Sequence, residues 1–190
     1  MKKRVGVLIS GTGSNMKALV TAGRAEASPF EVVCVASNKA DAAGIAWARG
    51  QGIETKVINH QDYASREAFD TALNAYLQSQ RLDLITCAGF MRIMTPVLIE
   101  PWEGRMLNIH PSLLPKYKGL HTHQRAIDAG DKEAGCSVHF VTTELDGGPM
   151  IAQARVPILA GDTAETLAAR VLVEEHKLYP KVVSQFTYLI

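Results

Sequence analysis

The sequence has almost no net charge, because 20 Lys and Arg are balanced by 19 Asp and Glu, leaving +1. Proteins that bind nucleic acid or an anionic membrane surface usually carry a clear basic excess, so the composition argues against both partners. No apolar run approaches the roughly 18 residues that a bilayer-spanning helix needs, which excludes a membrane protein. The ordinary content of 15 Gly and 8 Pro excludes collagen-like and most disordered classes.

Cysteine is scarce as well. Cys34, Cys87 and Cys136 are widely spaced, odd in number and placed in apolar stretches. This favours reduced, buried thiols over a disulfide framework or a zinc site. The basic N-terminus resembles a signal peptide, but its apolar part, residues 5–9, is shorter than the about 7–15 residues required. We therefore expect a buried first strand and a cytoplasmic protein.

The first half of the chain alternates between short apolar runs and helical patterns. In the most regular helical pattern, residues 65–79, Phe69, Leu73, Tyr76 and Leu77 fall on one side. Such alternation predicts β-α-β units and a parallel sheet covered on both faces. The predicted strands are residues 4–10, 31–37, 53–58 and 82–87, and the predicted helices are residues 14–24, 40–51 and 65–79.

The second half predicts an antiparallel addition to that sheet. A short strand at residues 107–110 is followed by strands at 136–142 and 150–157, joined by the turn Asp146-Gly147-Gly148-Pro149. A long helix runs from about Thr163, with Asp162 or Thr163 as its cap, to a kink or break at Pro180.

Together these patterns predict a single α/β domain over residues 1–190. Its Rossmann-like, mostly parallel twisted sheet would carry helices on both faces and an antiparallel edge. We expect a phosphate-binding half at about residues 1–100 and a catalytic half at about residues 101–190.

The stretch Ser10-Gly11-Thr12-Gly13-Ser14-Asn15 lies where the first strand passes into the first helix. Glycines allow a sharp turn that presents N–H groups, and the helix N-terminus adds partial positive charge, so a phosphate fits here. No Gly-Lys-Ser/Thr follows, which excludes a Walker A loop. Met16 replaces the third glycine of a dinucleotide fingerprint, which favours a monophosphate over NAD. A tight turn with a capping serine is the alternative.

Asn108 and His110 are two residues apart on a strand and therefore share a face. An amide N–H and a protonated imidazole at a strand end suit acyl chemistry, because both stabilise a developing oxyanion. A neighbouring carboxylate raises the pKa of an imidazole, and Asp146 is the candidate for that carboxylate. The alternative is a strand-end histidine bonded to backbone, with Asp146 serving only its turn.

These segments together resemble the glycinamide ribonucleotide transformylases, the folate-dependent formyltransferases of purine synthesis. The resemblance runs from residue 5 to about residue 180, in family order. Its matching pieces are SGTGSN (10–15), SNKAD (37–41), AGFMRI (88–93), LNIHPSLLPKY (107–117), GLHTH (119–123), SVHFV (137–141), ELDGGP (144–149) and EH (175–176).

The resemblance implies the formyltransferase fold and transfer of a formyl group from 10-formyltetrahydrofolate to glycinamide ribonucleotide. No metal and no covalent enzyme intermediate are implied, and the enzyme would be a monomer or homodimer. Carried onto matching positions, the catalytic set is Asn108, His110 and Asp146, and the ribonucleotide-binding residues are Gly13, Ser14, Asn15 and Glu175. The folate-binding residues are Arg66, Met91, Arg92, Ile93, Met94 and Asn108, with Thr142, Thr143, Glu144, Leu145 and Asp146 in a loop over the pterin.

Other histidines have simpler interpretations. His121 and His123 lack a third ligand for a metal, His139 fits a core histidine with satisfied hydrogen bonds, and His60 fits the surface. The competing functions are a tRNA formyltransferase, a formyltetrahydrofolate hydrolase, a nucleotide-binding dehydrogenase and a non-catalytic phosphate-binding module. The first two carry additional domains in their families, and the dehydrogenase needs the missing third glycine and ribose-binding acid.

Overall fold

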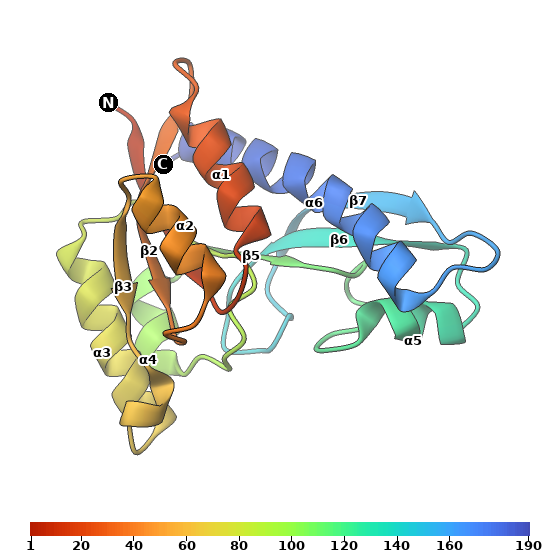
Figure 1. The fold of residues 1–190 in the computed structure, drawn as a ribbon, viewed down its shortest axis with the longest axis horizontal. Coiled ribbons are helices and arrows are strands. Elements are labelled where there is room, and N and C mark those ends of the chain that lie inside the picture. The colour runs from red at the N-terminus through yellow and green to blue at the C-terminus, as the bar shows by residue number, and fades with distance from the viewer.

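The computed structural model describes all 190 residues, and its strands form one sheet (Figure 1). The strand order is β3-β2-β1-β4-β5-β6-β7, with β1 to β5 parallel and β6 and β7 antiparallel. This arrangement confirms the predicted mostly parallel sheet with an antiparallel edge. The strands are β1 (Lys3–Ile9), β2 (Phe30–Ser37), β3 (Glu54–Val57), β4 (Leu84–Cys87), β5 (Met106–His110), β6 (Glu133–Phe140) and β7 (Met150–Pro157).

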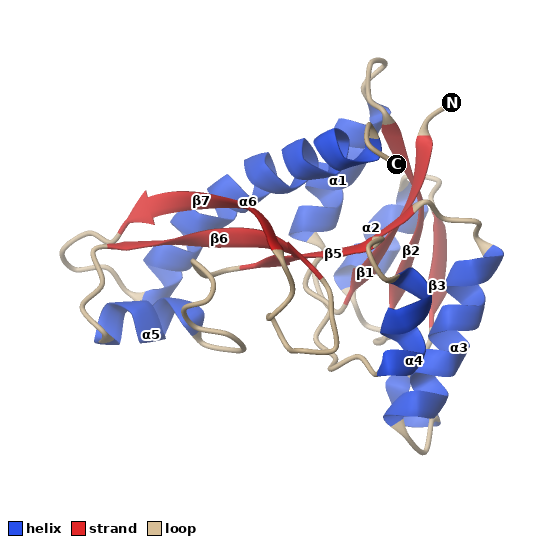
Figure 2. Cartoon of the chain, turned by 180° about the vertical axis from the view of Figure 1, so that it is seen from behind, coloured by secondary structure: helices blue, strands red, loops and turns tan.

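Helices cover both faces of the sheet, and each face has its own core. Helices α1, α2 and α6 pack with a cluster of 25 buried residues, whereas α3 and α4 pack with a cluster of 15 on the other face (Figure 2). The helices are α1 (Ser14–Arg24), α2 (Ala43–Gly50), α3 (Arg66–Ser79), α4 (Pro96–Ile99), α5 (Thr122–Asp128) and α6 (Ala164–Thr187), with 3-10 turns η1 (His60–Asp62) and η2 (Glu100–Trp102).

The helix predictions of the first half are confirmed, with small shifts at the ends. Helix α3 buries Phe69, Leu73 and Leu77, and the Ser65 hydroxyl accepts the Ala68 N–H at 3.1 Å to cap its start. The three cysteines are free and buried, as predicted. Burial raises the pKa of the Cys34 thiol to about 11 and those of Cys87 and Cys136 to about 12, so all three stay protonated.

Helix α6 corrects the expectation at Pro180, because the helix continues without a break to Thr187. A proline inside a helix costs about 3 kcal/mol, mainly through a lost hydrogen bond. Here Tyr179, Val182 and Val183 are buried in the core beside it, and their packing outweighs that cost. Thr163 is the cap, and it forms a reciprocal capping box with Thr166.

The strand order reverses between β1 and β4, which lie side by side although α1, β2, α2, β3 and α3 separate them in sequence. Open α/β sheets bind ligands in the crevice beyond the carboxyl ends of strands at such a reversal. The segments that follow β1, β4 and β5 therefore meet at one edge of the sheet. No helix is long and apolar enough to span a bilayer.

Candidate active site

The loop between β1 and α1 has the geometry expected of an anion site. Gly13 precedes the helix with a φ of 68°, in the left-handed region, and no side chain caps the first N–H groups of α1. Helix α2 packs against this loop, since the Gly44 N–H donates to the Gly11 carbonyl at 3.0 Å. A Cβ at Gly44 would lie only 3.1 Å from the Gly11 and Thr12 carbonyl oxygens, so a larger residue would push the loop outward.

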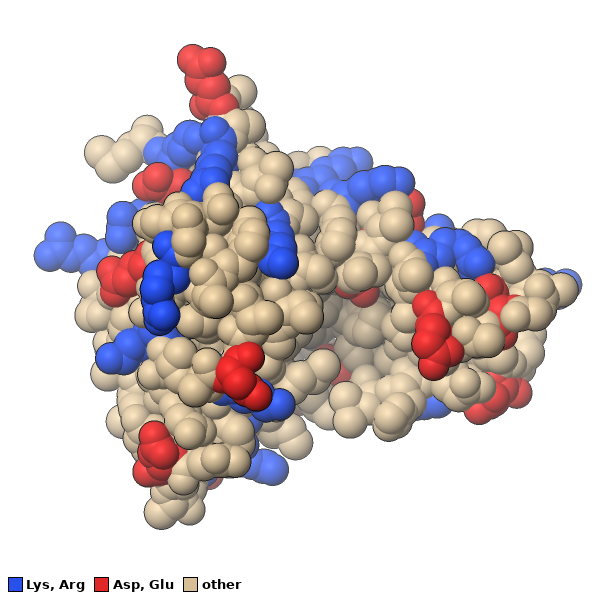
Figure 3. Space-filling model, in the orientation of Figure 1, with Lys and Arg blue, Asp and Glu red and all other residues tan.

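Asn15 and Glu175, 160 residues apart in sequence, meet beside this loop. The Asn15 amide donates to Glu175 Oε2 at 2.7 Å, and this bond joins α1 to α6. Glu175 is 7% exposed; burial raises the pKa of its carboxyl, and the Asn15 hydrogen bond acts in the opposite direction. The surface is hollowed between α2 and α5, with acidic atoms on the floor of the hollow (Figure 3).

His110 and Asp146 also meet. His110 Nδ1 lies 3.4 Å from Asp146 Oδ2, and both side chains are less than a tenth exposed. The other ring nitrogen, Nε2, lies 2.9 Å from the Tyr117 carbonyl oxygen. A neutral imidazole has one N–H, whereas an imidazolium has two, so only the charged ring donates toward both of these acceptors. The two ring nitrogens of His110 therefore face two acceptors, one of which is a carboxylate.

Asp146 is held in place by the turn that precedes β7. Its φ of 50° is left-handed, which is uncommon for a residue other than glycine and is tolerated best by Asp and Asn. Asp146 Oδ2 also accepts the Gly119 N–H at 2.9 Å, so the same oxygen ties the turn to the chain that follows His110. Asp146 therefore has two roles: it adopts the left-handed conformation that the turn requires, and its carboxylate lies beside His110.

His139 is the contact that the sequence interpretation missed. It faces Asn108 across the antiparallel β5–β6 pair, with Asn108 Nδ2 3.1 Å from His139 Nε2. Its Nδ1 lies 2.9 Å from the Phe140 carbonyl oxygen. Burial lowers the pKa of His139 most strongly, so the ring is neutral, donates from Nδ1 and accepts from Asn108. The alternation of polar Ser137 and His139 in an apolar strand was the available signal.

A cavity of about 90 Å³ gathers most of the predicted folate-binding residues. Met91 and Arg66 do not line it: the Met91 side chain is 65% exposed, and Arg66 is an exposed residue in the first turn of α3. His110 does not line it either, although its partner Asp146 does. The predicted residues that do line the cavity are Arg92, Ile93, Met94, Asn108, Thr142, Thr143, Glu144, Leu145 and Asp146.

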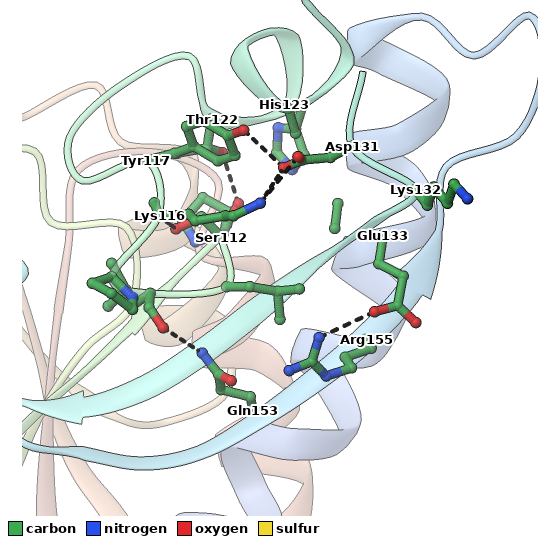
Figure 4. Close-up of a pocket in the computed structure, with 16 residues that line it drawn as sticks. Ser112, Lys116, Tyr117, Thr122, His123, Asp131, Lys132, Glu133, Gln153 and Arg155 are labelled. Carbon is green, nitrogen blue, oxygen red and sulfur yellow. Dashed lines mark hydrogen bonds and ion pairs between the residues drawn. The ribbon is translucent and has the colours of Figure 1, made fainter. Parts of the chain in front are cut away.

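A larger cavity, about 600 Å³, lies outside the predicted site (Figure 4). Residues 111–117, which follow His110, form one wall, and the β6–β7 hairpin forms another. Two ion pairs line it: Lys116 with Asp131 at 3.0 Å, and Arg155 with Glu133 at 3.1 Å. His123, for which the sequence predicts no metal-binding role, also lines this cavity. No cluster of three or more His, Cys, Asp or Glu with metal-binding geometry is present.

The comparisons with known proteins agree with this geometry. A family model described as Formyl transferase matches residues 3–183. Phosphoribosylglycinamide formyltransferase of Escherichia coli is 51% identical over 180 residues, covering 95% of this chain and 85% of that protein. The trifunctional purine biosynthetic protein adenosine-3 of Bos taurus is 50% identical over 179 residues, but this chain spans only 18% of its length.

Solved structures give the same result. The crystal structure of phosphoribosylglycinamide formyltransferase from Brucella melitensis is 55% identical with a TM-score of 0.94, covering 98% of this chain and 96% of that one. Glycinamide ribonucleotide transformylase 1 from Symbiobacterium toebii superposes with a TM-score of 0.96 at 44% identity, covering 98% of this chain and 88% of that one.

Proposed function

Because this chain belongs to the formyl transferase family, we propose that it transfers the formyl group of 10-formyltetrahydrofolate to the amine of N1-(5-phospho-D-ribosyl)glycinamide. The products are the N-formyl ribonucleotide and tetrahydrofolate, in a step of purine synthesis. Relatives with this activity in their names match 95% or more of the chain, which supports the assignment. The observation that carries the proposal is the His110–Asp146 ion pair, which lies beside Asn108 at the carboxyl end of β5.

The chemistry requires stabilisation of negative charge on the formyl oxygen. The acceptor amine attacks the formyl carbon directly, and the carbonyl oxygen becomes an oxyanion. One Asn108 N–H is bound to His139, which leaves its second N–H free to donate to that oxygen. The His110 imidazolium adds positive charge, and Asp146 keeps it protonated. The carbon–N10 bond then breaks, and N10 of the folate receives the proton that the amine loses.

The acceptor would bind along the loop after β1. The N–H groups of Gly13, Ser14 and Asn15 would hold its phosphate at the start of α1, where the helix dipole favours an anion. Glu175 would accept hydrogen bonds from the ribose hydroxyls. The Asn15–Glu175 bond supports this placement, because it puts the ribose and phosphate groups on adjoining elements.

The donor would bind in the cavity lined by residues 92–94 and 142–146, with the exposed Met91 and Arg66 contacting its outer end. At about 90 Å³ the cavity is smaller than the roughly 300 Å³ at which ligand sites usually begin. The loop at 142–146 would therefore move outward to admit the fused ring. Exposed Ile93 and Leu145, 53% and 54% accessible, are apolar surface that such a ring would cover.

The test is to follow loss of 10-formyltetrahydrofolate with and without the ribonucleotide acceptor. We expect loss only when both substrates are present, in a 1:1 ratio with N-formyl product detected by mass spectrometry. Loss without acceptor would identify a hydrolase, and no loss with either mixture would identify a binding module. Either outcome would reject the proposed transfer.

A further inference from the structure

The segment between β4 and α4 lacks regular structure where the donor is proposed to bind. Residues 90–94 take part in no backbone-to-backbone hydrogen bond. Phe90, Arg92, Ile93 and Met94 nevertheless line the cavity. All five residues are half-buried or exposed, so water can bind these peptide groups when no ligand is present. The position of this segment must then be fixed by contacts at its ends.

At the first end, the Ser10 hydroxyl holds the segment. Its Oγ accepts the Met91 N–H at 2.7 Å and donates to Asn38 Oδ1 at 2.6 Å. Ser10 is 6% exposed and Asn38 is 1% exposed, so neither bond is exchanged easily with water. The Asn38 carbonyl in turn accepts a hydrogen bond from His60 at 2.9 Å. Ser10 is also the first residue of the phosphate loop, so it joins that loop to the donor segment.

At the second end, Asp70 on α3 holds the segment. Asp70 Oδ2 accepts the Thr95 N–H at 2.6 Å and the Thr95 hydroxyl at 2.8 Å. The Asp70 side chain is fully buried. Thr95 precedes α4 and has no side-chain cap of its own, so Asp70 supplies the acceptor at that helix start. Phe69, the residue before Asp70, also contacts the segment: the Arg92 guanidinium lies over its ring, 5.2 Å from the centroid.

We propose that Ser10 and Asp70 are positioning residues that clamp the two ends of residues 90–94 and leave the peptide groups between them free for the donor. Three N–H and four C=O groups lie between the Met91 N–H and the Thr95 N–H, which are the two clamped groups. This inference rests on the proposed function, since it concerns the donor of that reaction.

The clamp acts on binding before chemistry. Without it, the segment samples several conformations, and the apparent dissociation constant rises by the reciprocal of the competent fraction. We expect Ser10→Ala and Asp70→Asn to raise KM for the formyl folate about tenfold, the scale of one buried hydrogen bond. For Asp70→Asn, KM for the ribonucleotide and kcat should stay within about twofold of wild type, because Asp70 bonds only to Thr95 and not to the phosphate loop.

The experiment measures KM for each substrate, kcat, and the Kd of a non-reactive deaza analogue of the formyl folate by fluorescence titration. Asp70→Ala should raise that Kd more than Asp70→Asn, because Asn keeps one acceptor for the Thr95 N–H. If Asp70→Ala does not fold, the Asn variant carries the test. The matched control is Thr187→Val, which deletes another buried hydroxyl near the end of α6. It should change neither KM nor the analogue Kd.

A wild-type analogue Kd in both Ser10→Ala and Asp70→Asn would overturn the clamp while leaving the proposed reaction intact. An equal rise in both KM values of Asp70→Asn would also overturn it, since that result indicates general loosening. If the wild-type protein itself transfers no formyl group and binds no analogue, the proposed function fails and this inference fails with it.

Discussion

At the scale of single residues, the site is decided by which hydrogen-bond donors and acceptors face each other. His110 lies between a carboxylate and a carbonyl, and His139 lies between a carbonyl and an amide. His139 is neutral because burial lowers its pKa, whereas His110 has the Asp146 carboxylate 3.4 Å from its Nδ1. A charged ring suits oxyanion stabilisation, and a neutral ring suits the orientation of Asn108.

The Asp146→Asn variant separates charge from shape. The amide oxygen of Asn can still accept the Gly119 N–H, but the negative charge that supports a protonated His110 is lost. We expect kcat for formyl transfer to fall by about 10²–10³, the usual cost of losing one oxyanion-stabilising group, while the circular dichroism spectrum stays unchanged. The kcat of His110→Ala should fall by a similar factor.

The control for this prediction is Glu133→Gln, which neutralises an exposed carboxylate paired with Arg155. Surface ion pairs contribute little, so its turnover should match wild type. Near-normal turnover of Asp146→Asn would contradict the proposed role of the ion pair.

At the scale of elements, the turn between β6 and β7 carries the loop that would cover the donor. A Cβ at Gly148 would overlap the Phe140 carbonyl oxygen, a backbone atom that cannot move without opening the hairpin. We expect Gly148→Ala to lower stability by about 2–3 kcal/mol, which corresponds to roughly 4–12 °C in Tm for a domain of this size. KM for the formyl folate should rise as the loop is displaced.

Gly130→Ala provides the comparison for Gly148→Ala. Gly130 has a φ of 70° with nothing within 4 Å of its added Cβ, so only backbone strain applies, at about 1–2 kcal/mol. Its KM for the folate should equal that of wild type. Equal effects of the two substitutions on both quantities would show that the crowding at Gly148 is unimportant.

The elements also show where sequence patterns are informative. Helices with a full apolar stripe, such as α1 and α3, were predicted within a few residues because periodicity and capping act locally. The four-residue α4 was not predicted, since one turn has no period to detect. The break expected at Pro180 was wrong because tertiary packing of α6 outweighs a local preference.

At the scale of the whole molecule, the sheet brings distant segments to one edge, and only part of that convergence follows from sequence. Spacing on a strand placed Asn108 and His110 on one face, and the candidate carboxylate Asp146 does meet His110. The bonds that the Met91 and Thr95 N–H groups donate to Ser10 and Asp70 join segments far apart in sequence, and no local pattern encodes them. Long-range polar contacts of this kind are therefore seen only in the structure and cannot be predicted from sequence patterns.

The buried carboxylate of Glu175 lowers the stability of the fold and is also proposed to bind the ribose hydroxyls of the acceptor. Burial raises the pKa of its carboxyl, so between the unfolded and folded pKa values the folded state binds more protons than the unfolded state. Stability then falls as pH rises through that interval, and at neutral pH the full cost of the buried charge is present. Glu175→Gln removes this charge, and the amide oxygen can still accept the hydrogen bond from Asn15.

We therefore expect Glu175→Gln to melt at a higher temperature than wild type at pH 7, with the difference vanishing below about pH 4, where the wild-type carboxyl is protonated in both states. KM for the ribonucleotide should rise, because an amide binds ribose hydroxyls less strongly than a carboxylate does. Calorimetry across about pH 3–8 measures the first effect, and steady-state kinetics measure the second. Glu174→Gln, on the adjoining residue paired with Lys177, controls for loss of charge on α6 and should show neither effect. A lower Tm for Glu175→Gln at pH 7 would mean that the carboxylate stabilises the fold, and the trade-off argued here would be wrong.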